Sequence, residues 1–283
     1  MSGGSRIDLA ALRLVEEGKV YDLGSGWWPG MPLAEGHPPF QVLTFRSPAG
    51  ERNQDDVDFM RGNTVNFGFI SELLMCTMHS GTHIDALAHT TCGPDHTWHG
   101  GHSSDTELGD FGPLNNDASE LPPMLVRGVC LDAPGMLGVE RLEAGQGVGA
   151  ADLEKICERQ GVEPRQGDVV LLRTGAMGLW PDAAALAAVE GAGLDLSGAE
   201  WLSARGVAAV GGDTSVLEAM PSGVEGDPQP VHRHLIHEKG IPILEWVSQE
   251  ELAAEEVWEF LFVCVPLNVR GATGSLVRPL AVV

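Results

Sequence analysis

Three continuous apolar segments in the second half of the chain constrain its fold more than any other feature. They read VRGVCLD at 126–132, DVVLLRT at 168–174 and EFLFVCVPLNV at 259–269. Short runs of this kind are typical of strands that are covered on both faces, as in sheets flanked by helices. The segment ADLEKICERQ at 151–160 has a helical pattern and lies between the first two strands. We therefore expect a single α/β domain with mixed sheets and outer helices.

The other predicted elements follow from local signals. Ser197 with Glu200, and Ser248 with Glu251, form capping-box patterns at the starts of two helices. Further helices are expected at 8–17 and 230–240, and further strands at 207–214 and 241–246. Two stretches rich in Gly, Pro, Asp and Asn predict long loop excursions from a single domain that covers residues 1–283; these stretches are 41–62 and 92–124.

The net charge of the chain is its most unusual bulk property, at −23 over 283 residues. A surface of this sign repels nucleic-acid phosphates and anionic membranes, and it raises the local concentration of divalent cations. No apolar run reaches the roughly 18 residues that a membrane span needs, and MSGGSRIDLA lacks the pattern of a secretory signal. Five scattered cysteines without a CxxC pair are typical of free thiols. We therefore expect a cytoplasmic protein that acts on a small molecule and binds neither nucleic acid nor membrane.

The segment MHSGTHIDALAH at 78–89 contains three histidines and one aspartate. In a regular strand, His79, His83, Asp85 and His89 would share one face, but the first two would lie roughly 13 Å apart. A helix would turn Asp85 away from His79. Gly81 permits a backbone bend that brings His79 inward. The spacing therefore predicts a kinked strand that presents two imidazoles and a carboxylate to one ion.

This donor set is suited to Zn, Mn or Fe(II), with open positions for water or substrate. The alternative is a polar loop with solvated histidines, which is our interpretation of His96, His99 and His102 in HTWHGGH. A non-haem Fe(II) oxygenase uses the same ligand types, commonly as HxD followed by a distant histidine. Here both histidines precede the aspartate, so the order of the ligands favours a hydrolytic site.

HSGTHIDALAH resembles the HxGTHxDxPxH signature of the metal-dependent cyclase-like hydrolases, a family that includes bacterial kynurenine formamidase and isatin hydrolase. Leu87 stands where many members have proline. Weaker similarities follow in the order found in the family, namely WPG at 28–30, DVVLLRTG at 168–175, VGGDTSV at 210–216 and VHRHLIHEKGIPILEWV at 231–247. The resemblance extends from about residue 20 to the C-terminus. It implies the swivelling β/β/α, cyclase-like architecture.

The resemblance also implies a role for each residue of the first motif. His79, His83 and Asp85 would bind a divalent metal, Zn or Mn, and His89 would be the catalytic acid and base. Trp28, in the WPG segment, would border the substrate pocket.

A second ion is implied by the later similarity, since family members hold one or two ions. Asp85 would bridge to this ion, and His232 and Glu245 would complete its ligands. His234 and His237 lie on the same predicted helix and are rivals of His232.

The predicted reaction is hydrolysis of an amide, formamide, lactam or lactone bond of a small molecule by metal-activated water. No GxSxG elbow is present in the sequence, so a serine nucleophile of that type is not expected. Two alternatives stay open: a non-haem Fe(II) oxygenase that uses the same ligand types, and a catalytically silent metal-binding protein. The resemblance further implies a homodimer or homotetramer. The identity of the substrate and the choice between Zn and Mn do not follow from the sequence.

Overall fold

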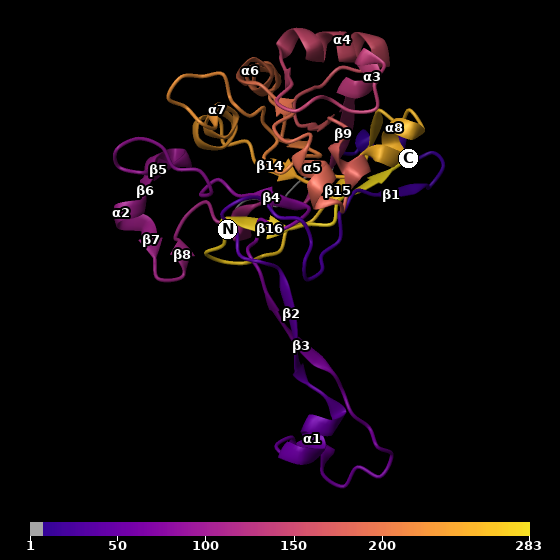
Figure 1. Cartoon of the computed structure of the whole chain (residues 1–283), viewed down its shortest axis with the longest axis vertical. Coiled ribbons are helices and arrows are strands. Elements are labelled where there is room, and N and C mark those ends of the chain that lie inside the picture. Colours follow the sequence, from indigo (N-terminus) through magenta and orange to yellow (C-terminus); the bar gives the residue numbers. More distant parts are fainter. Residues whose placement is uncertain (1–7) are drawn as a thin grey trace.

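The computed structural model describes residues 8–283 and is built around a mixed sheet of nine strands (Figure 1). The four central strands are parallel, and the strands on both sides of them are antiparallel. In spatial order the strands are β1 (Val20–Asp22), β17 (Leu280–Val282), β15 (Glu259–Cys264), β9 (Met124–Asp132), β11 (Val169–Arg173), β13 (Ala209–Gly212), β14 (Ile243–Glu245), β4 (His83–Asp85) and β16 (Gly274–Leu276).

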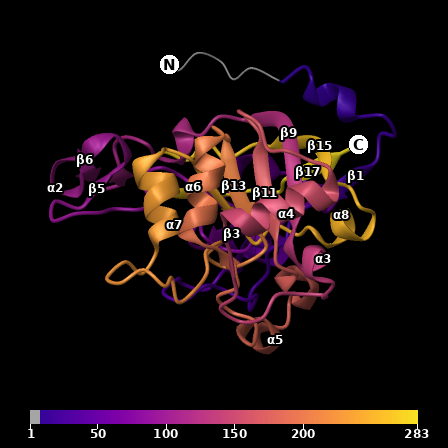
Figure 2. The ribbon, with the colours of Figure 1, turned by 90° about the horizontal axis from the view of Figure 1, so that it is seen from above.

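Helices cover one face of this sheet, with α4 (Ala150–Gln160) and α6 (Leu196–Ala204) side by side over its centre (Figures 1 and 2). Val170 and Leu172 of β11 pack against this helical layer, whereas Val169 and Leu171 face a second core on the other side. Burial of both faces explains why the central strands are continuous apolar runs. The predicted α/β domain with outer helices is confirmed.

Shorter elements complete the body of the molecule. The helical elements are η1 (Ala11–Leu14), η4 (Ala118–Glu120), α3 (Ala133–Leu137), η5 (Ala176–Leu179), α5 (Ala183–Ala187), α7 (Pro230–His232), the π-helical η6 (Arg233–Glu238) and α8 (Glu250–Ala254). The strands β10 (Gly147–Val148) and β12 (Gly193–Leu194) form a separate parallel pair. No helix in the described part of the chain is long and apolar enough to cross a membrane.

Several predicted boundaries are wrong, and the local chemistry explains them. Asp195, not Ser197, caps α6, because its Oδ1 accepts from the N–H of Gly198. Helix α8 begins after Gln249 without a side-chain cap. The predicted helix at 8–17 contains only the short 3-10 helix η1, and β15 ends at Cys264, two residues before Pro266.

The excursion predicted at 41–62 is longer than expected and forms an arm that extends away from the body (Figure 1). Strands β2 (Gln41–Arg46) and β3 (Ser71–Met75) pair as its antiparallel stem, and α1 (Pro48–Gln54) and η2 (Asp58–Met60) lie beyond the stem. The second predicted excursion, 92–124, contains two small hairpins, and β9 begins at its last residue. Its elements are β5 (Thr97–Trp98), η3 (His99–Gly101), β6 (His102–Ser103), α2 (Ser104–Glu107), β7 (Leu108–Gly109) and β8 (Gly112–Pro113).

Candidate metal centre

The centre is built on β4, which pairs with β14 on one side and β16 on the other. Before this strand the chain turns at Gly81, whose φ of 52° lies in the left-handed region. The hydroxyl of Thr82 donates to the carbonyl of Trp246 at 2.6 Å and accepts from the N–H of Ser25 at 2.7 Å. These bonds fix the turn, and the predicted kinked strand is confirmed.

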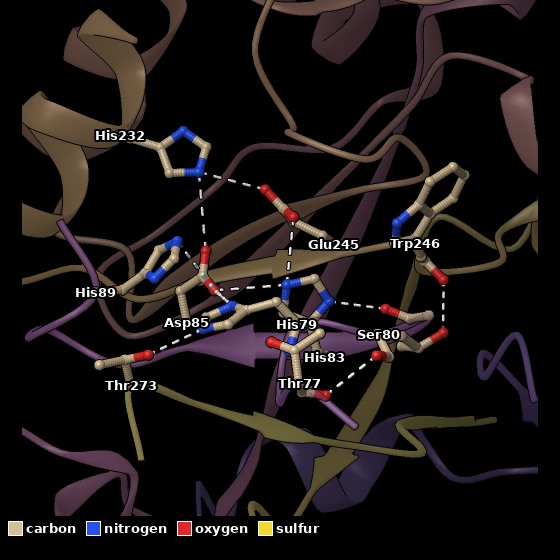
Figure 3. A network of polar contacts seen from close by, with 12 residues as sticks. Thr77, His79, Ser80, His83, Asp85, His89, His232, Glu245, Trp246 and Thr273 are labelled. Atoms are coloured by element: carbon tan, nitrogen blue, oxygen red, sulfur yellow. Dashed lines mark hydrogen bonds and ion pairs between the residues drawn. The ribbon is translucent and has the colours of Figure 1, made fainter. Parts of the chain in front are cut away.

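The side chain of Asp85 lies at the middle of the cluster (Figure 3). Its Oδ1 is 2.7 Å from Nδ1 of His79, 3.5 Å from Nε2 of His83 and 4.0 Å from Nε2 of His89. Its Oδ2 is 3.8 Å from Nε2 of His232. The turn at Gly81 therefore brings His79 to the carboxylate that a straight strand would keep out of its reach.

Glu245 joins the cluster from the neighbouring strand. The register of β14 with β4 places it directly opposite His83. Its Oε2 is 3.3 Å from Nε2 of His83, and its Oε1 is 3.3 Å from Nε2 of His232. Two carboxylates and the imidazoles of three buried histidines, His79, His83 and His232, thus converge on one small volume, with His89 at its edge.

Each of these three imidazoles is oriented by a partner on its other nitrogen. Nδ1 of His83 lies 2.7 Å from the carbonyl of Gly81, and Nε2 of His79 lies 3.0 Å from Oγ1 of Thr273. Nδ1 of His232 hydrogen-bonds to a carboxylate oxygen of Glu218, which is fully buried. In the neutral form of each ring, the nitrogen that faces the carboxylates therefore carries the lone pair, the arrangement that metal-binding histidines require.

Several buried atoms of the cluster make no hydrogen bond of regular geometry, although Oδ1 of Asp85 and Nδ1 of His79 lie only 2.7 Å apart. They include both carboxylate oxygens of Asp85, Oε1 of Glu245 and Nδ1 of His79. The three side chains are at most 7% exposed, and unpaired buried polar atoms are costly. Two groups of donor atoms lie close enough to hold an ion: His79, Asp85 and His89, and His83, Asp85 and Glu245. The unpaired oxygens and the nitrogen lone pairs fit a divalent cation.

Electrostatics within the cluster are consistent with such a cation. Burial lowers the pKa of His83, but Asp85 and Glu245 outweigh burial and raise that pKa to about 10. Burial likewise opposes protonation of His232, whose pKa is nevertheless raised to about 10 by Glu218 and Glu245. Protonated imidazoles therefore supply, in the metal-free protein, the positive charge that the two carboxylates need.

The cluster opens into a cavity of about 710 Å³. His79, His83, His89, His232 and Glu245 all line it, and His89 has the most exposed imidazole among the four histidines, at 29%. The cavity also reaches residues from other segments, among them Glu35, His37, Glu190, Ser215, Met220 and Gln229. The volume is within the range of small-molecule sites.

The structure separates His232 from its rivals. His234 lies 2.8 Å from Oγ of Ser203 through Nε2 and 3.1 Å from Glu238 through Nδ1, away from the cluster. His237 lies at the loop 92–124, with Nε2 3.4 Å from Oγ1 of Thr97. The loop histidines 96, 99 and 102 also lie outside the cavity lining.

Trp28, which the sequence predicts at the border of the substrate pocket, does not line the cavity within the described chain. A turn at Pro29 and Gly30 follows it, and its ring packs edge-on against Trp180 with centroids 5.6 Å apart. Trp180 in turn lies 5.1 Å from the ring of Trp246. Trp28 is thus the outer member of an aromatic row.

Three residues near the site were not predicted from the sequence. His37 lines the cavity and stacks on His79 at 5.4 Å, and burial and the neighbouring histidines lower its pKa. Glu218 and Thr273 orient His232 and His79. Each is a single residue in a segment without a motif, so only the three-dimensional contacts identify it.

The fold and the buried cluster define an α/β protein with a histidine–carboxylate centre suited to a divalent metal. The chain belongs to the cyclase family, because the family model described as "Putative cyclase" matches residues 21–219. No curated protein matches the sequence.

Solved structures share the fold. A crystal structure described as a novel cyclase is 24% identical, with a TM-score of 0.81, and the match covers 97% of this chain and 92% of that one. Isatin hydrolase A from Ralstonia solanacearum is 22% identical, with 99% of each chain covered and a TM-score of 0.69. A "predicted metal-dependent hydrolase" from Bacillus stearothermophilus is 19% identical, with a TM-score of 0.58 and coverage of 94% and 98%.

Proposed function

We propose that the protein is a metal-dependent hydrolase that cleaves an amide, formamide, lactam or lactone bond of a small molecule. The observation that supports this most directly is the buried cluster, in which unpaired oxygens of Asp85 and Glu245 face histidine nitrogens at the floor of an open cavity. Isatin hydrolase A and a protein described as a "predicted metal-dependent hydrolase" share the fold, which is consistent with the proposal.

The proposed ligands form two sets that share Asp85. His79, His83 and Asp85 would hold a first ion, Zn or Mn, and Asp85, His232 and Glu245 a second. These sets differ from the two groups of closest donors in the metal-free cluster, in which His89 accompanies His79 and His83 accompanies Glu245. A divalent ion at this position lowers the pKa of a water molecule and polarises a carbonyl group. The chain itself orients the proposed ligands and shields them from solvent, since their side chains are at most 7% exposed.

His89 is the proposed acid and base. Burial, together with His79 and His232, outweighs Asp85 and lowers the pKa of His89 to about 4. The imidazole is therefore neutral near pH 7 and can accept a proton at Nε2 from the attacking water. The same nitrogen then donates that proton to the leaving nitrogen or oxygen of the substrate.

The cysteines are poor alternative nucleophiles. None of the five lines the cavity in the described part of the chain. Burial raises the pKa of Cys130 and also that of Cys264, so neither thiol is ionised at neutral pH. This favours water as the nucleophile.

Metal analysis combined with a substrate screen tests the proposal. The purified protein would be assayed with Zn or Mn, and again after chelation, on cyclic imides, lactams, lactones and N-formyl aromatic amines. Hydrolysis that is lost with chelator and restored by metal is the expected result. Oxygen consumption that depends on Fe(II) would support an oxygenase instead. Stoichiometric metal without turnover on the whole panel would support a catalytically silent binding protein.

A further inference from the structure

A smaller hollow adjoins the cavity of the proposed metal centre. It has a volume of about 150 Å³, and its walls include Leu33, Leu186, Val189 and Trp246. We call this hollow the apolar annex. The cavity and the annex share several lining residues, among them Glu35, Glu190 and Val216, and we call these shared residues the border. The two hollows are therefore neighbours in the molecule.

Trp246 connects the annex to the centre, because it directly follows Glu245 in the chain. Its φ of 54° is a left-handed conformation that bulky residues rarely adopt. The N–H of Trp246 donates to the carbonyl of Thr214 at 3.1 Å, and its carbonyl accepts from Thr82 at 2.6 Å. Trp246 is only 6% exposed, and its ring packs against that of Trp180 with centroids 5.1 Å apart. Backbone strain held in this way is typical of functional positions.

Thr214 supplies a second sign that the annex receives a ligand. It lines the annex, is 8% exposed, and its hydroxyl has no hydrogen-bond partner within the described chain. An unpaired hydroxyl in a buried wall is unfavourable in the free protein. A polar atom at the edge of a bound, largely apolar group can satisfy it.

The border between the two hollows carries negative charge. Glu35 and Glu190 are exposed and line both the cavity and the annex. Within the described residues 8–283, neither lining includes Lys or Arg. A carboxylate on the part of the substrate that passes this border would meet two like charges without a compensating cation.

We infer that the annex binds a compact, uncharged apolar group of the substrate while the scissile carbonyl lies at the metal centre. The volume is comparable to that of engineered protein cavities that bind benzene, so the group is about the size of a phenyl ring. Glu35 and Glu190 select against substrates with a carboxylate on this group. The inference rests on the proposed hydrolase function and specifies its substrate class.

Hydroxamic acids test the annex on the metal-loaded protein, because they chelate a divalent metal without being cleaved as substrates. Calorimetry would compare acetohydroxamic acid with benzohydroxamic acid, which differ in the group available for the annex. Burial of the ring should tighten binding roughly tenfold or more.

Ala183 is exposed and lines the annex, so Ala183→Phe should remove this gain and leave acetohydroxamate binding unchanged. Ala184→Phe is the matched control, because Ala184 is exposed on the same helix but does not line the annex.

A second pair of ligands tests the charge selection. The monohydroxamates of succinic acid and of succinamic acid have similar size, but only the first carries a carboxylate. Wild type should bind the acid several-fold more weakly than the amide, and the double variant Glu35→Gln, Glu190→Gln should bind them nearly equally. The same preference in both proteins would overturn the role of the two glutamates.

The outcomes separate this inference from the function on which it rests. If acetohydroxamate binds but benzohydroxamate binds no more tightly, the annex inference is wrong and the metal centre stands. If Ala183→Phe and Ala184→Phe have the same effect, the annex is also rejected. If acetohydroxamate does not bind to the metal-loaded protein at all, both the proposed function and the annex inference are overturned.

Discussion

Glu218 holds His232 in the orientation that the candidate metal centre requires. One carboxylate oxygen accepts from Nδ1 of His232 and, at 3.2 Å, from the backbone N–H of the same residue. The other accepts from the N–H of Val231 at 3.2 Å. Nε2 of His232 is consequently directed at Asp85 and Glu245. A residue that no motif indicated thus fixes a proposed ligand.

Replacement of Glu218 by Gln should weaken metal binding. The amide keeps most of the shape but removes the charge that makes the imidazole a stronger donor, and such substitutions commonly cost about tenfold to a hundredfold in affinity. Competition with a fluorescent chelator would measure the change. Glu225→Gln is the control, because Glu225 is exposed and lies outside the cavity lining. Equal metal affinity of both variants and wild type would show that Glu218 does not contribute to the metal centre.

Metal binding near pH 7 should release protons. The pKa values of His83 and His232 are raised to about 10 in the metal-free protein, so both imidazoles are protonated at neutral pH and must lose a proton to bind metal. Calorimetric titration with metal in buffers of different ionisation enthalpy measures this release. Binding without proton release would contradict either the raised pKa values or the assignment of these two residues as ligands.

The same shifts predict how the metal-free protein responds to pH. Because the folded pKa values of about 10 lie above the unfolded value near 6.5, protonation stabilises the fold. This contribution is complete below about pH 6.5 and is lost as the pH rises through about 10. The melting temperature of the metal-free protein should therefore fall over this window, and bound metal should reduce the fall. A flat profile would contradict the raised pKa values.

The proposed role of His89 predicts a selective loss of activity. His89→Ala should lower kcat by roughly a hundredfold to ten-thousandfold, the usual contribution of general acid–base catalysis. Metal content should stay near that of wild type, because His79, His83, Asp85, His232 and Glu245 remain. His96→Ala is the control, since His96 is exposed in the loop 92–124. Loss of metal together with activity would make His89 a ligand instead.

The features that the sequence predicted correctly depend on local pattern. β9, β11 and α4 have the apolar spacing of buried strands and an amphipathic helix, and the structure contains them with boundaries within about two residues of those predicted. The cluster at 79–89 is compact enough that the bend at Gly81 followed from spacing alone. Local patterns of this kind survive in the fold because no tertiary contact opposes them.

The missed features depend on contacts between distant segments. Two backbone features bring the Glu218 side chain to His232. Leu217, the preceding residue, has a left-handed conformation, and the backbone of Glu218 forms a β-bridge with Leu194. His37 is a lone histidine between glycine and proline, with no partner nearby in the sequence. Both faces of the stem strands are exposed, so the stem has no buried face. Its sequence therefore lacks the alternation that marks a half-buried strand, and the segment is predicted as a loop.

The arm supports the expectation of an oligomer. Its stem exposes Phe45, Leu73 and Leu74 at 49% or more, and a two-stranded ribbon has little independent stability in water. Replacing these three residues by Thr should shift the protein towards monomer in light scattering coupled to size exclusion. Thr substitutions at Leu9 and Leu137, which are exposed on the body, are the control. A wild-type protein that is already monomeric would contradict this prediction.

The bend at Gly81 should be intolerant of any side chain. A Cβ at this position would lie 2.7 Å from Oγ of Ser25 and 2.8 Å from Cε of Met31, and the φ of 52° is unfavourable for alanine. Gly81→Ala should therefore lower the free energy of unfolding by about 2–4 kcal/mol, since steric overlap adds to the strain of a left-handed residue. It should also weaken metal binding, because relief of the clash moves His79 away from Asp85.

Gly93→Ala separates the two effects, since Gly93 has a φ of 76° but a Cβ there would meet no atom within 4 Å. It should lose about 1 kcal/mol in chemical denaturation and keep its metal affinity. Equal losses in the two variants would mean that the left-handed backbone alone, and not the packing of the bend, controls the site.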